Sequence, residues 1–364
     1  MRDPWQLTEL SRRFAENSAS SRPRAPLYAE LSKGIAADPS LHGLLLHAPP
    51  DQRLPVLLFA CVHASLLADA DHDLAAWYPT VTDAPRSPED PELITTFARF
   101  VEDRAPQILA MLATRSTQTN EVGRCIMFLV GFDIVTAEVG PLAHVDVGCS
   151  GGLTLLSDRY QYRYEHGADR LGRIMTTVGS PSTVQITTSV RGELVLPEQI
   201  PTIAARCGID IAPIDVTDDA EAQWLEACVW PDQPDRARRL RAAIALAREQ
   251  PPELVAGDAV EQVAATITRL ASSGHPVVTN SWVLNYLTGE QRSAYVSELD
   301  RIGSELDFSW IYAEAPALTP ELPWDVELDD PHLTMIALAR WRSGRRTVEY
   351  LATSHPHGYW IHAY

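Results

Sequence analysis

The residues most able to do chemistry lie at positions 144–156, HVDVGCSGGLTLL. The centre of this stretch matches G-x-S-x-G, the turn that presents the nucleophilic serine of many hydrolases, with Ser150 as the nucleophile. Together with the preceding Val145-Asp146-Val147, these residues also resemble an acidic strand that runs into a glycine-rich turn, as in nucleotide-type cofactor sites. The rest of the sequence is needed to decide between these two interpretations.

The amino-acid composition disfavours several kinds of binding partner and active site. The chain has 364 residues, 45% of them hydrophobic, and a net charge of −18 that disfavours binding to nucleic acid. Its single lysine, Lys33, lies in a helical-looking segment, so neither a P-loop nor a pyridoxal Schiff base is expected. Five isolated cysteines indicate neither a disulfide framework nor a zinc ribbon. The charged N-terminus and the shortness of the longest apolar run predict a cytoplasmic protein without a membrane partner.

The pattern of apolar residues predicts two domains. Residues 1–138 show helical spacing and are expected to form an N-terminal helical cap domain. Residues 139–364 alternate between strands and helices, which predicts an α/β domain with a Rossmann-like parallel sheet. Within it, residues 160–200 are predicted to be a β-rich insertion, and GGLTLLSDRY the start of a helix. The C-terminal segment is expected to add an antiparallel hairpin that turns at RSGRR.

The hydrolase interpretation needs elements that the upstream sequence does not offer. An elbow serine follows earlier strands, one of which supplies an oxyanion amide through an H-G-G-G-type loop. Here the upstream residues look helical, and the nearest approach to such a loop is LHGLLLH. Asp258 and His355 are available downstream as triad partners, although a chain of this length offers many such residues. The turn also lacks the spacing of the dinucleotide-binding G-x-G-x-x-G motif.

Residues 146–152, DVGCSGG, fit a third interpretation best. They resemble the D/E-x-G-x-G-x-G turn of class I S-adenosylmethionine-dependent methyltransferases, with Ser150 in place of the middle glycine. The resemblance implies that Asp146, Gly148, Ser150 and Gly152 lie against the cofactor, because a Cβ at the glycines would obstruct its close approach. Free N–H groups at the start of the following helix would face its carboxylate.

The later strands extend this resemblance to the class I methyltransferases. It implies that Asp210 binds the ribose hydroxyls, and that Asp258 with Ala259 contacts the adenine. Asn280, Ser281 and Trp282 would end the strand at the methyl-transfer site. Asp210 follows Gly148 at an unusually long interval, which the β-rich insertion is expected to explain.

Several segments also resemble one bacterial family of uncharacterised proteins, a domain of unknown function common in actinobacteria. They include QTNEVGRC, VGCSGGLTLLSDRYQYRY, CGIDIAPIDV and NSWVLNYL, and the resemblance extends over most of the chain. It implies the methyltransferase-like fold but no particular substrate.

A polar segment, TQTNEVGR, directly precedes a very apolar helix. Arg124 is a candidate partner for the cofactor carboxylate, and Glu121 a candidate substrate-binding residue. The alternative is a helix cap followed by a surface arginine.

Other candidates stand alone in the sequence. Glu314, at the end of a predicted strand, is a candidate catalytic base. His63 is a second candidate base, although a buried hydrogen-bonded histidine is the favoured interpretation. Trp282 and Tyr286 could contact a substrate or sulfonium through cation–π attraction, and core packing explains them equally well. The three histidines of HPHGYWIH lack the spacing of a metal site.

The sequence thus predicts an S-adenosylmethionine-dependent methyltransferase that acts on an oxygen or nitrogen of a small molecule. Its expected cofactor is S-adenosyl-L-methionine, and the oligomeric state, including a homodimer, stays open. The alternatives are a serine hydrolase using Ser150 and a methyltransferase-like protein that binds the cofactor without catalysis.

Overall fold

The computed structural model describes residues 4–169, 172–318 and 333–363. It divides into two compact units. Unit 1 comprises residues 1–119 and 217–241, and unit 2 comprises residues 120–216 and 242–364.

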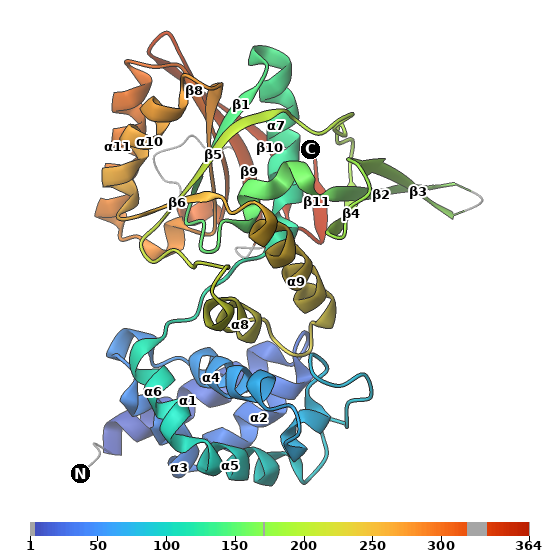
Figure 1. Cartoon of the computed structure of the whole chain (residues 1–364), viewed down its shortest axis with the longest axis vertical. Helices are drawn as coiled ribbons and strands as arrows, with labels where there is room; N and C mark the ends of the chain where they lie inside the picture. The colour runs from blue at the N-terminus through green and yellow to red at the C-terminus, as the bar shows by residue number, and fades with distance from the viewer. Residues whose placement is uncertain (1–3, 170–171, 319–332, 364) are drawn as a thin grey trace. The chain divides into compact units, whose positions relative to one another are not determined.

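Unit 1 is helical, and its elements end where prolines and short turns interrupt the apolar pattern. Several of its helices carry proline in the first turn, where a missing N–H group costs no hydrogen bond. The elements are α1 (Pro4–Ser21), α2 (Pro26–Ala36), α3 (Pro39–His42), η1 (Gly43–His47), η2 (Pro50–Gln52), α4 (Pro55–Ala68), η3 (Asp73–Trp77), α5 (Leu93–Asp103), α6 (Ala105–Thr114) and α8 (Asp219–Ala227). The almost wholly apolar α4 is buried at the centre and packs against α6 and α8 (Figure 1).

Unit 2 is built around an eleven-stranded, mainly parallel sheet, in the order β3-β2-β4-β11-β10-β9-β8-β7-β1-β5-β6. The strands are β1 (Leu142–Val147), β2 (Gln161–Asp169), β3 (Gly172–Val178), β4 (Gln185–Arg191), β5 (Ile203–Asp210), β6 (Glu253–Ala256), β7 (His275–Ser281), β8 (Phe308–Glu314), β9 (Thr334–Arg342), β10 (Arg345–Ser354) and β11 (Trp360–His362). β6, β5, β1, β7 and β8 are mutually parallel neighbours. The mixed α/β architecture is therefore confirmed.

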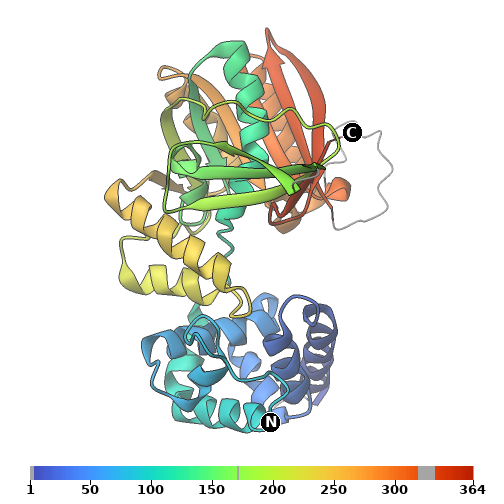
Figure 2. The ribbon, with the colours of Figure 1, turned by 90° about the vertical axis from the view of Figure 1, so that its right-hand side faces the viewer.

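Helices cover both faces of this sheet (Figures 1 and 2). The helical segments of unit 2 are η4 (Val122–Arg124), α7 (Cys125–Val139), η5 (Leu153–Arg159), α10 (Ala259–Leu270), η6 (Leu284–Tyr286), α11 (Gly289–Gly303) and η7 (Pro316–Leu318). α9 (Pro234–Glu249) contains residues of both units. On β8, Trp310 packs against Tyr295 of α11, whereas the next residue, Ile311, packs against Gly131 of α7. Successive side chains of a strand point to opposite faces, so α11 and α7 cover opposite sides of the sheet.

The division of the chain differs from the predicted boundary at residue 138. The apolar helix α7 belongs to unit 2 because it packs against β8, β9 and β10. Residues 217–241 belong instead to unit 1, where Trp224 Nε1 donates to Ser116 O (3.0 Å) and Arg115 pairs with Glu221 (2.7 Å).

The predicted β-rich segment 160–200 contains β2, β3 and β4, which extend the main sheet through the β4–β11 pair. The expected C-terminal hairpin is present as β9 and β10, which pair antiparallel. β9 in turn pairs antiparallel with β8 and so ends the parallel part of the sheet.

Candidate functional site at the carboxyl ends of the parallel strands

Polar residues gather where the parallel strands of unit 2 end. Because β6, β5, β1, β7 and β8 run in the same direction, their carboxyl ends share one edge of the sheet. Ligands of open α/β sheets bind at this edge. The predicted residues at or directly after these strand ends are Asp146, Gly148, Ser150, Gly152, Asp210, Asp258, Ala259, Asn280, Ser281, Trp282 and Glu314.

The glycine-rich turn after β1 is tied to β5. Gly148 N and Cys149 N both donate to Ile209 O (2.8 and 3.2 Å). Ser150 N donates to one carboxylate oxygen of Asp210 (2.8 Å), and Ala212 N donates to the other (2.9 Å). Asp210 therefore holds the backbone of the turn, and its carboxylate retains acceptor capacity for a further donor.

The expected helix after this turn is wrong in type. Residues Leu153–Arg159 form a 3₁₀ segment with a kink at Leu156, and the chain then enters β2. Buried tyrosines of this region hold the segment, because Tyr160 and Tyr162 donate to the carbonyls of Leu153 and Ser157 (both 2.6 Å). A segment this short lacks the aligned dipole of a long α-helix, so the predicted anion site at a helix start has no counterpart here.

The glycines of the turn are required by packing within the protein. Gly148 has a φ of 75°, and a Cβ on it would lie 2.3 Å from Val283 Cγ2. Gly152 has a φ of 68°, and its Cβ would lie 2.7 Å from Leu254 Cδ2. Both glycines thus face side chains of the protein itself, Leu254 of β6 and Val283 after β7, whereas the resemblance implied a close approach to a cofactor.

Asp146 lies at the centre of a buried hydrogen-bond chain. Thr154 Oγ1 donates to Asp146 Oδ2, and Thr279 Oγ1 donates to Asp146 Oδ1 (2.7 Å). Because the Thr279 hydroxyl hydrogen is used in this way, His144 Nε2 must donate to Thr279 Oγ1 (2.8 Å). Burial raises the pKa of Asp146 to about 6, although the two threonine hydrogen bonds act against this shift. Burial lowers the pKa of His144 to about 3 and keeps its ring neutral.

Replacing Thr279 with valine is expected to lower the free energy of unfolding by about 2–3 kcal/mol, because buried groups of both His144 and Asp146 lose a partner. Urea unfolding at pH 7 measures the change. Thr136→Val is the matched control, because the Thr136 hydroxyl is buried without a hydrogen-bond partner. That control should change stability little, and an equal loss in both variants would contradict the role of the chain.

Glu314 is a fully buried carboxyl group at the end of β8. Its Oε1 accepts hydrogen bonds from Asn280 Nδ2 (2.7 Å) and Val283 N (2.8 Å). Its Oε2 is buried and has no hydrogen-bond partner among the residues that the structure describes. Burial raises the pKa of Glu314 to about 7, although the bonds from Val283 and Asn280 oppose the shift. Asn280 is itself fixed by Trp310 Nε1, which donates to its Oδ1.

Residues 120–124 place two further charged side chains, Glu121 and Arg124, in unit 2. Arg124 Nη1 donates to Ser281 O, and Nε donates to Pro356 O (both 3.0 Å). Its positive charge lowers the pKa values of both Asp146 and Glu314, as a minor effect beside burial. Glu121 is buried, with Oε1 on Gly123 N (2.9 Å) and Oε2 on His357 Nδ1 (3.1 Å). Arg124 thus joins the C-terminal loop to the end of β7.

The remaining candidates are placed as follows. Asp258 caps α10 by accepting from Val260 N (2.8 Å), and Ala259 begins this helix. Trp282 has a positive φ of 57° and donates through Nε1 to Thr334 Oγ1 (2.8 Å). Tyr286 is 76% exposed. Among the described residues, no group of three or more His, Cys, Asp or Glu side chains is arranged to hold a metal ion.

His63 belongs to the helical unit and is fully buried in α4. Its Nδ1 contacts Ala227 O (3.1 Å), and its Nε2 contacts Thr80 Oγ1 (2.8 Å). Burial lowers its pKa to about 4. Both ring nitrogens are therefore engaged by residues of unit 1.

Ser150 occupies a strained position, with a φ of 50°. Its Oγ is buried and has no hydrogen-bond partner, so the described part of the chain places no histidine in hydrogen-bond contact with it. The structure therefore provides a nucleophile-like turn without a base that contacts the hydroxyl.

Three residues of the buried chain were not predicted: His144, Thr154 and Thr279. His144 and Thr279 are polar residues within the buried strands β1 and β7, and both are fully buried. Because parallel strands covered on both faces are apolar, a polar residue inside one is the sequence feature that could have identified them.

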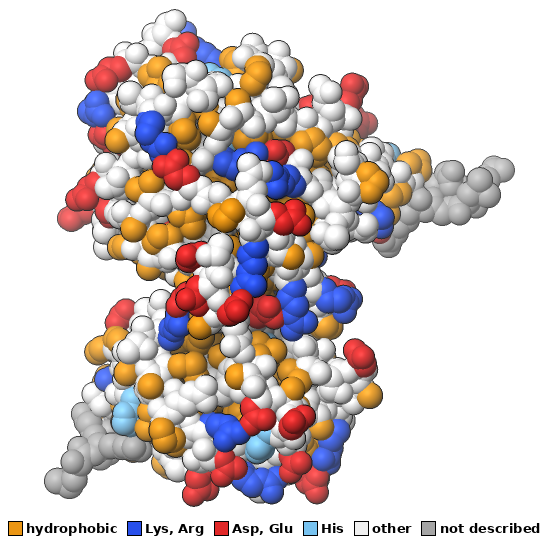
Figure 3. Space-filling model, in the orientation of Figure 1, with side chains coloured by type: hydrophobic (Ala, Val, Ile, Leu, Met, Phe, Trp, Pro, Cys, Tyr) orange, Lys and Arg blue, Asp and Glu red, His pale blue; other side chains and the backbone are white. Residues whose placement is uncertain are grey.

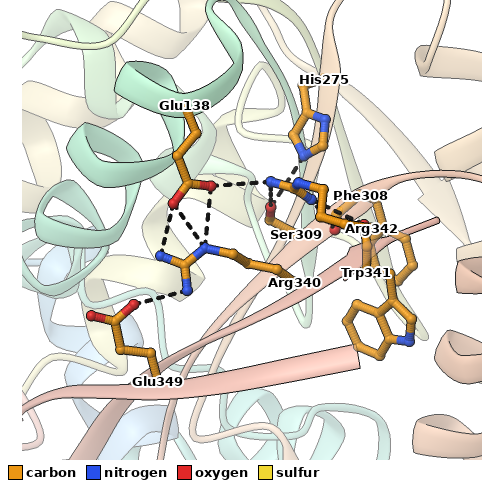
Figure 4. Close-up of polar contacts among 8 residues, drawn as sticks. All are labelled: Glu138, His275, Phe308, Ser309, Arg340, Trp341, Arg342 and Glu349. Carbon is orange, nitrogen blue, oxygen red and sulfur yellow. Dashed lines mark hydrogen bonds and ion pairs between the residues drawn. The ribbon is translucent and has the colours of Figure 1, made fainter. Parts of the chain in front are cut away.

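A second charged network lies at the opposite, amino-terminal ends of β7 and β8 (Figure 4). Arg340 and Arg342 of β9 both bond to Glu138 in the last turn of α7 (2.9 and 3.2 Å). Arg342 also bonds to Ser309, which contacts His275 Nε2 (3.1 Å). A glutamate near a helix C-terminus is unfavourable because the helix dipole is negative there, and the two arginines offset this effect. Their bonds also attach the end of α7 to β9 of the sheet.

The structure therefore defines a mixed α/β protein whose large, mainly parallel sheet gathers buried carboxyl groups at the carboxyl ends of its strands. Residues 8–362 match the model of the family described as "Uncharacterized protein conserved in bacteria (DUF2332)", and the chain belongs to that family. Neither a curated protein nor a solved structure matches the chain.

Two surface properties complete the description. Within the described ranges, each helix is too short or too polar to cross a membrane. On the face seen in Figure 3, acidic and basic side chains are interspersed. The ion pairs of the described residues include Arg346 with Asp300 (2.9 Å) and Arg301 with Glu298 (2.8 Å).

Proposed function

We propose that this protein is an S-adenosylmethionine-dependent methyltransferase that acts on an oxygen or nitrogen of a small molecule. The observation that carries the proposal is the order of the five parallel strands, β6-β5-β1-β7-β8. Numbered along the chain, this order is 3-2-1-4-5, as in doubly wound sheets that bind dinucleotides. Such sheets bind their ligands where the strand order reverses, which here lies between β1 and β7. Asp146 and Asn280 come from those two strands.

The polar groups at this edge fit the charges of the cofactor. Its sulfonium and amino groups are cationic, and Asp146, Asp210 and Glu314 supply carboxylates. Arg124 supplies a positive charge for its carboxylate. A ligand at this edge is also supported by three buried oxygens that lack a hydrogen-bond partner within the described ranges: Ser150 Oγ, Ser281 Oγ and Glu314 Oε2.

By the methyltransferase resemblance, Asp210 would bind the ribose hydroxyls, and Asp258 with Ala259 would contact the adenine. The turn departs from the resemblance, because Val283 and Leu254 occupy the space beside Gly148 and Gly152. Among the residues predicted to bind the cofactor, the acidic ones therefore support the proposal more strongly than the glycines do.

When bound, S-adenosylmethionine would supply the methyl group, and the chain's residues would hold and orient the acceptor. Methyl transfer depends mainly on alignment, and a base is needed only when the acceptor atom carries a proton. Glu314 suits this role, because Asn280 and Val283 N hold its Oε1 and leave Oε2 to accept a proton. With a pKa of about 7, Glu314 would be ionised and able to act as a base above neutral pH.

Calorimetric titration with S-adenosylhomocysteine tests the proposal. Wild type is expected to bind, and Asp210→Ala and Asp258→Ala are each expected to weaken binding by about tenfold or more, since each removes a charged hydrogen-bond acceptor. Asp218→Ala is the matched control, because Asp218 caps α8 as Asp258 caps α10. Unchanged affinity in both variants would refute the assignment of these residues.

The two alternatives give different results in the same experiments. A serine hydrolase would not bind S-adenosylhomocysteine, and a fluorophosphonate would label Ser150 but not a Ser150→Ala variant. A protein that only binds the cofactor would give the calorimetric signal without turnover across a panel of alcohols, phenols and amines.

A further inference from the structure

Among the buried polar atoms of unit 1 that have no hydrogen-bond partner in the described part of the chain are Tyr28 Oη, Tyr78 Oη and Asp232 Oδ2. They come from different segments, since Tyr28 lies in α2, Tyr78 follows η3, and Asp232 lies between α8 and α9. We call these three residues the Tyr–Asp cluster. Buried polar atoms are rarely left without a partner, so such a cluster indicates a bound molecule or water.

The members of the cluster lie near one another. Asp232 Oδ1 accepts a hydrogen bond from Leu27 N (3.0 Å), the residue that directly precedes Tyr28. Burial and then the charge of Asp232 raise the pKa of Tyr78. Burial, Tyr78 and Asp232, in that order, raise the pKa of Tyr28. The three groups are therefore close enough for their charges to interact, although no direct hydrogen bond joins them.

Aromatic rings surround this cluster. The Tyr28 ring stacks on Phe59 with a centroid distance of 4.2 Å, and it lies 6.0 Å from the Trp230 ring. The Tyr78 ring lies 5.5 Å from the His63 ring, and both side chains are fully buried. Aromatic faces and a carboxylate together attract cations, whereas an anion would be repelled by both.

The chemistry of the cluster selects the kind of ligand. An ionised carboxylate only accepts hydrogen bonds, and a phenol oxygen can accept one while its hydrogen points elsewhere. Burial raises the pKa of Asp232, whereas backbone N–H groups, of Leu27 first, lower it. Its charge is thus balanced by backbone dipoles, and a ligand with several N–H donors and a positive charge would complete the site.

We propose that the Tyr–Asp cluster binds the ammonium group of a small primary amine. The amine would donate to Asp232 Oδ2 and to the two tyrosine oxygens, with the rings of Tyr28 and Trp230 nearby. This site lies wholly in unit 1 and does not depend on the function proposed for the sheet edge of unit 2.

The test is a calorimetric titration with methylammonium chloride at pH 8, in buffer of matched ionic strength. Wild type is expected to bind, and Asp232→Asn to bind at least about tenfold more weakly, because a charge-assisted hydrogen bond is lost. Asparagine can still accept from Leu27 N, so this variant should fold. Tyr78→Phe should weaken binding by a few-fold, and tetramethylammonium, which has no N–H group, should bind more weakly than methylammonium.

Tyr295→Phe is the control, because Tyr295 is also a buried tyrosine without a hydrogen-bond partner but belongs to unit 2. It should leave methylammonium binding unchanged. The proposal is overturned if wild type gives no binding heat, or if binding is equal in wild type, Asp232→Asn and Tyr78→Phe. A crystal structure grown with methylammonium that shows only ordered water between the three side chains would also overturn it.

Discussion

Replacing Glu314 with glutamine is expected to make the protein more stable at pH 8 by about 3 kcal/mol and to leave stability at pH 4 nearly unchanged. The reason is that burial raises the pKa of this carboxyl from 4.5 to about 7. Glutamine keeps an acceptor oxygen for Asn280 and Val283 N and carries no charge. The variant therefore removes the cost of burying a carboxylate without removing its hydrogen bonds.

The direction of this pH dependence follows from proton binding. Between about pH 4.5 and 7 the unfolded chain releases the Glu314 proton, whereas the folded protein still holds it. The free energy of unfolding of wild type therefore falls as the pH rises through this range, and the loss is complete above about pH 7. Urea unfolding of both proteins at pH 4, 6 and 8 measures the difference. A constant difference across the three pH values would show that Glu314 is not a buried acid with a raised pKa.

Replacing Gly148 with alanine is expected to lower the free energy of unfolding by about 3 kcal/mol. Its φ of 75° is unfavourable for alanine by about 1–2 kcal/mol, and the added Cβ would collide with Val283 Cγ2 at 2.3 Å. Gly344 provides the control, because its φ is 76° and the nearest described atom to an added Cβ, Ser304 Cα, lies 3.9 Å away, an ordinary van der Waals contact. Gly344→Ala should therefore cost only the backbone part of the effect.

The double variant Gly148→Ala/Val283→Ala separates the two contributions to this effect. It is expected to recover part of the collision but none of the backbone strain, giving a non-additive pair. Equal losses for Gly344→Ala and Gly148→Ala, with no coupling to Val283, would mean that packing does not explain Gly148. Under that result, the space beside the turn would be open to a ligand, as the sequence resemblance implied.

The parts of the fold that the sequence predicts are those governed by local patterns. The buried strands β1, β7 and β8 are short apolar runs, and the turn at RSGRR joins β9 to β10 as expected. The apolar helix α7 was also recognisable as buried. Its apolar surface, however, does not specify which core it joins, and it packs on the sheet although it was assigned to the helical domain.

The same limit applies to residues 217–241. Their helical pattern is visible in the sequence, but the contacts that bring them into unit 1 involve partners about a hundred residues away, such as Ser116 for Trp224. The prediction of a helix after Gly152 was wrong for a different reason. Two tyrosines bind its carbonyls and favour a 3₁₀ turn over the α-helix that its apolar residues suggested.

The position of the candidate site was predictable because the ends of the strands can be located in the sequence. Parallel strands place their carboxyl ends at one edge, so Asp146, Asp210 and Glu314 could be grouped from the sequence alone. The directions of their side chains could not be predicted, because they depend on partners in other strands. Asp146 is enclosed by Thr154 and Thr279, and Asp210 binds the backbone of Ser150.

A crystal structure of the full chain grown with saturating S-adenosylhomocysteine tests the central claim most directly. We predict density for the ligand at the carboxyl ends of β1, β5 and β7, with its ribose at Asp210 and its amino acid part near Arg124. Density at any other place, or an empty sheet edge in crystals soaked at saturating concentration, would contradict the proposed methyltransferase function.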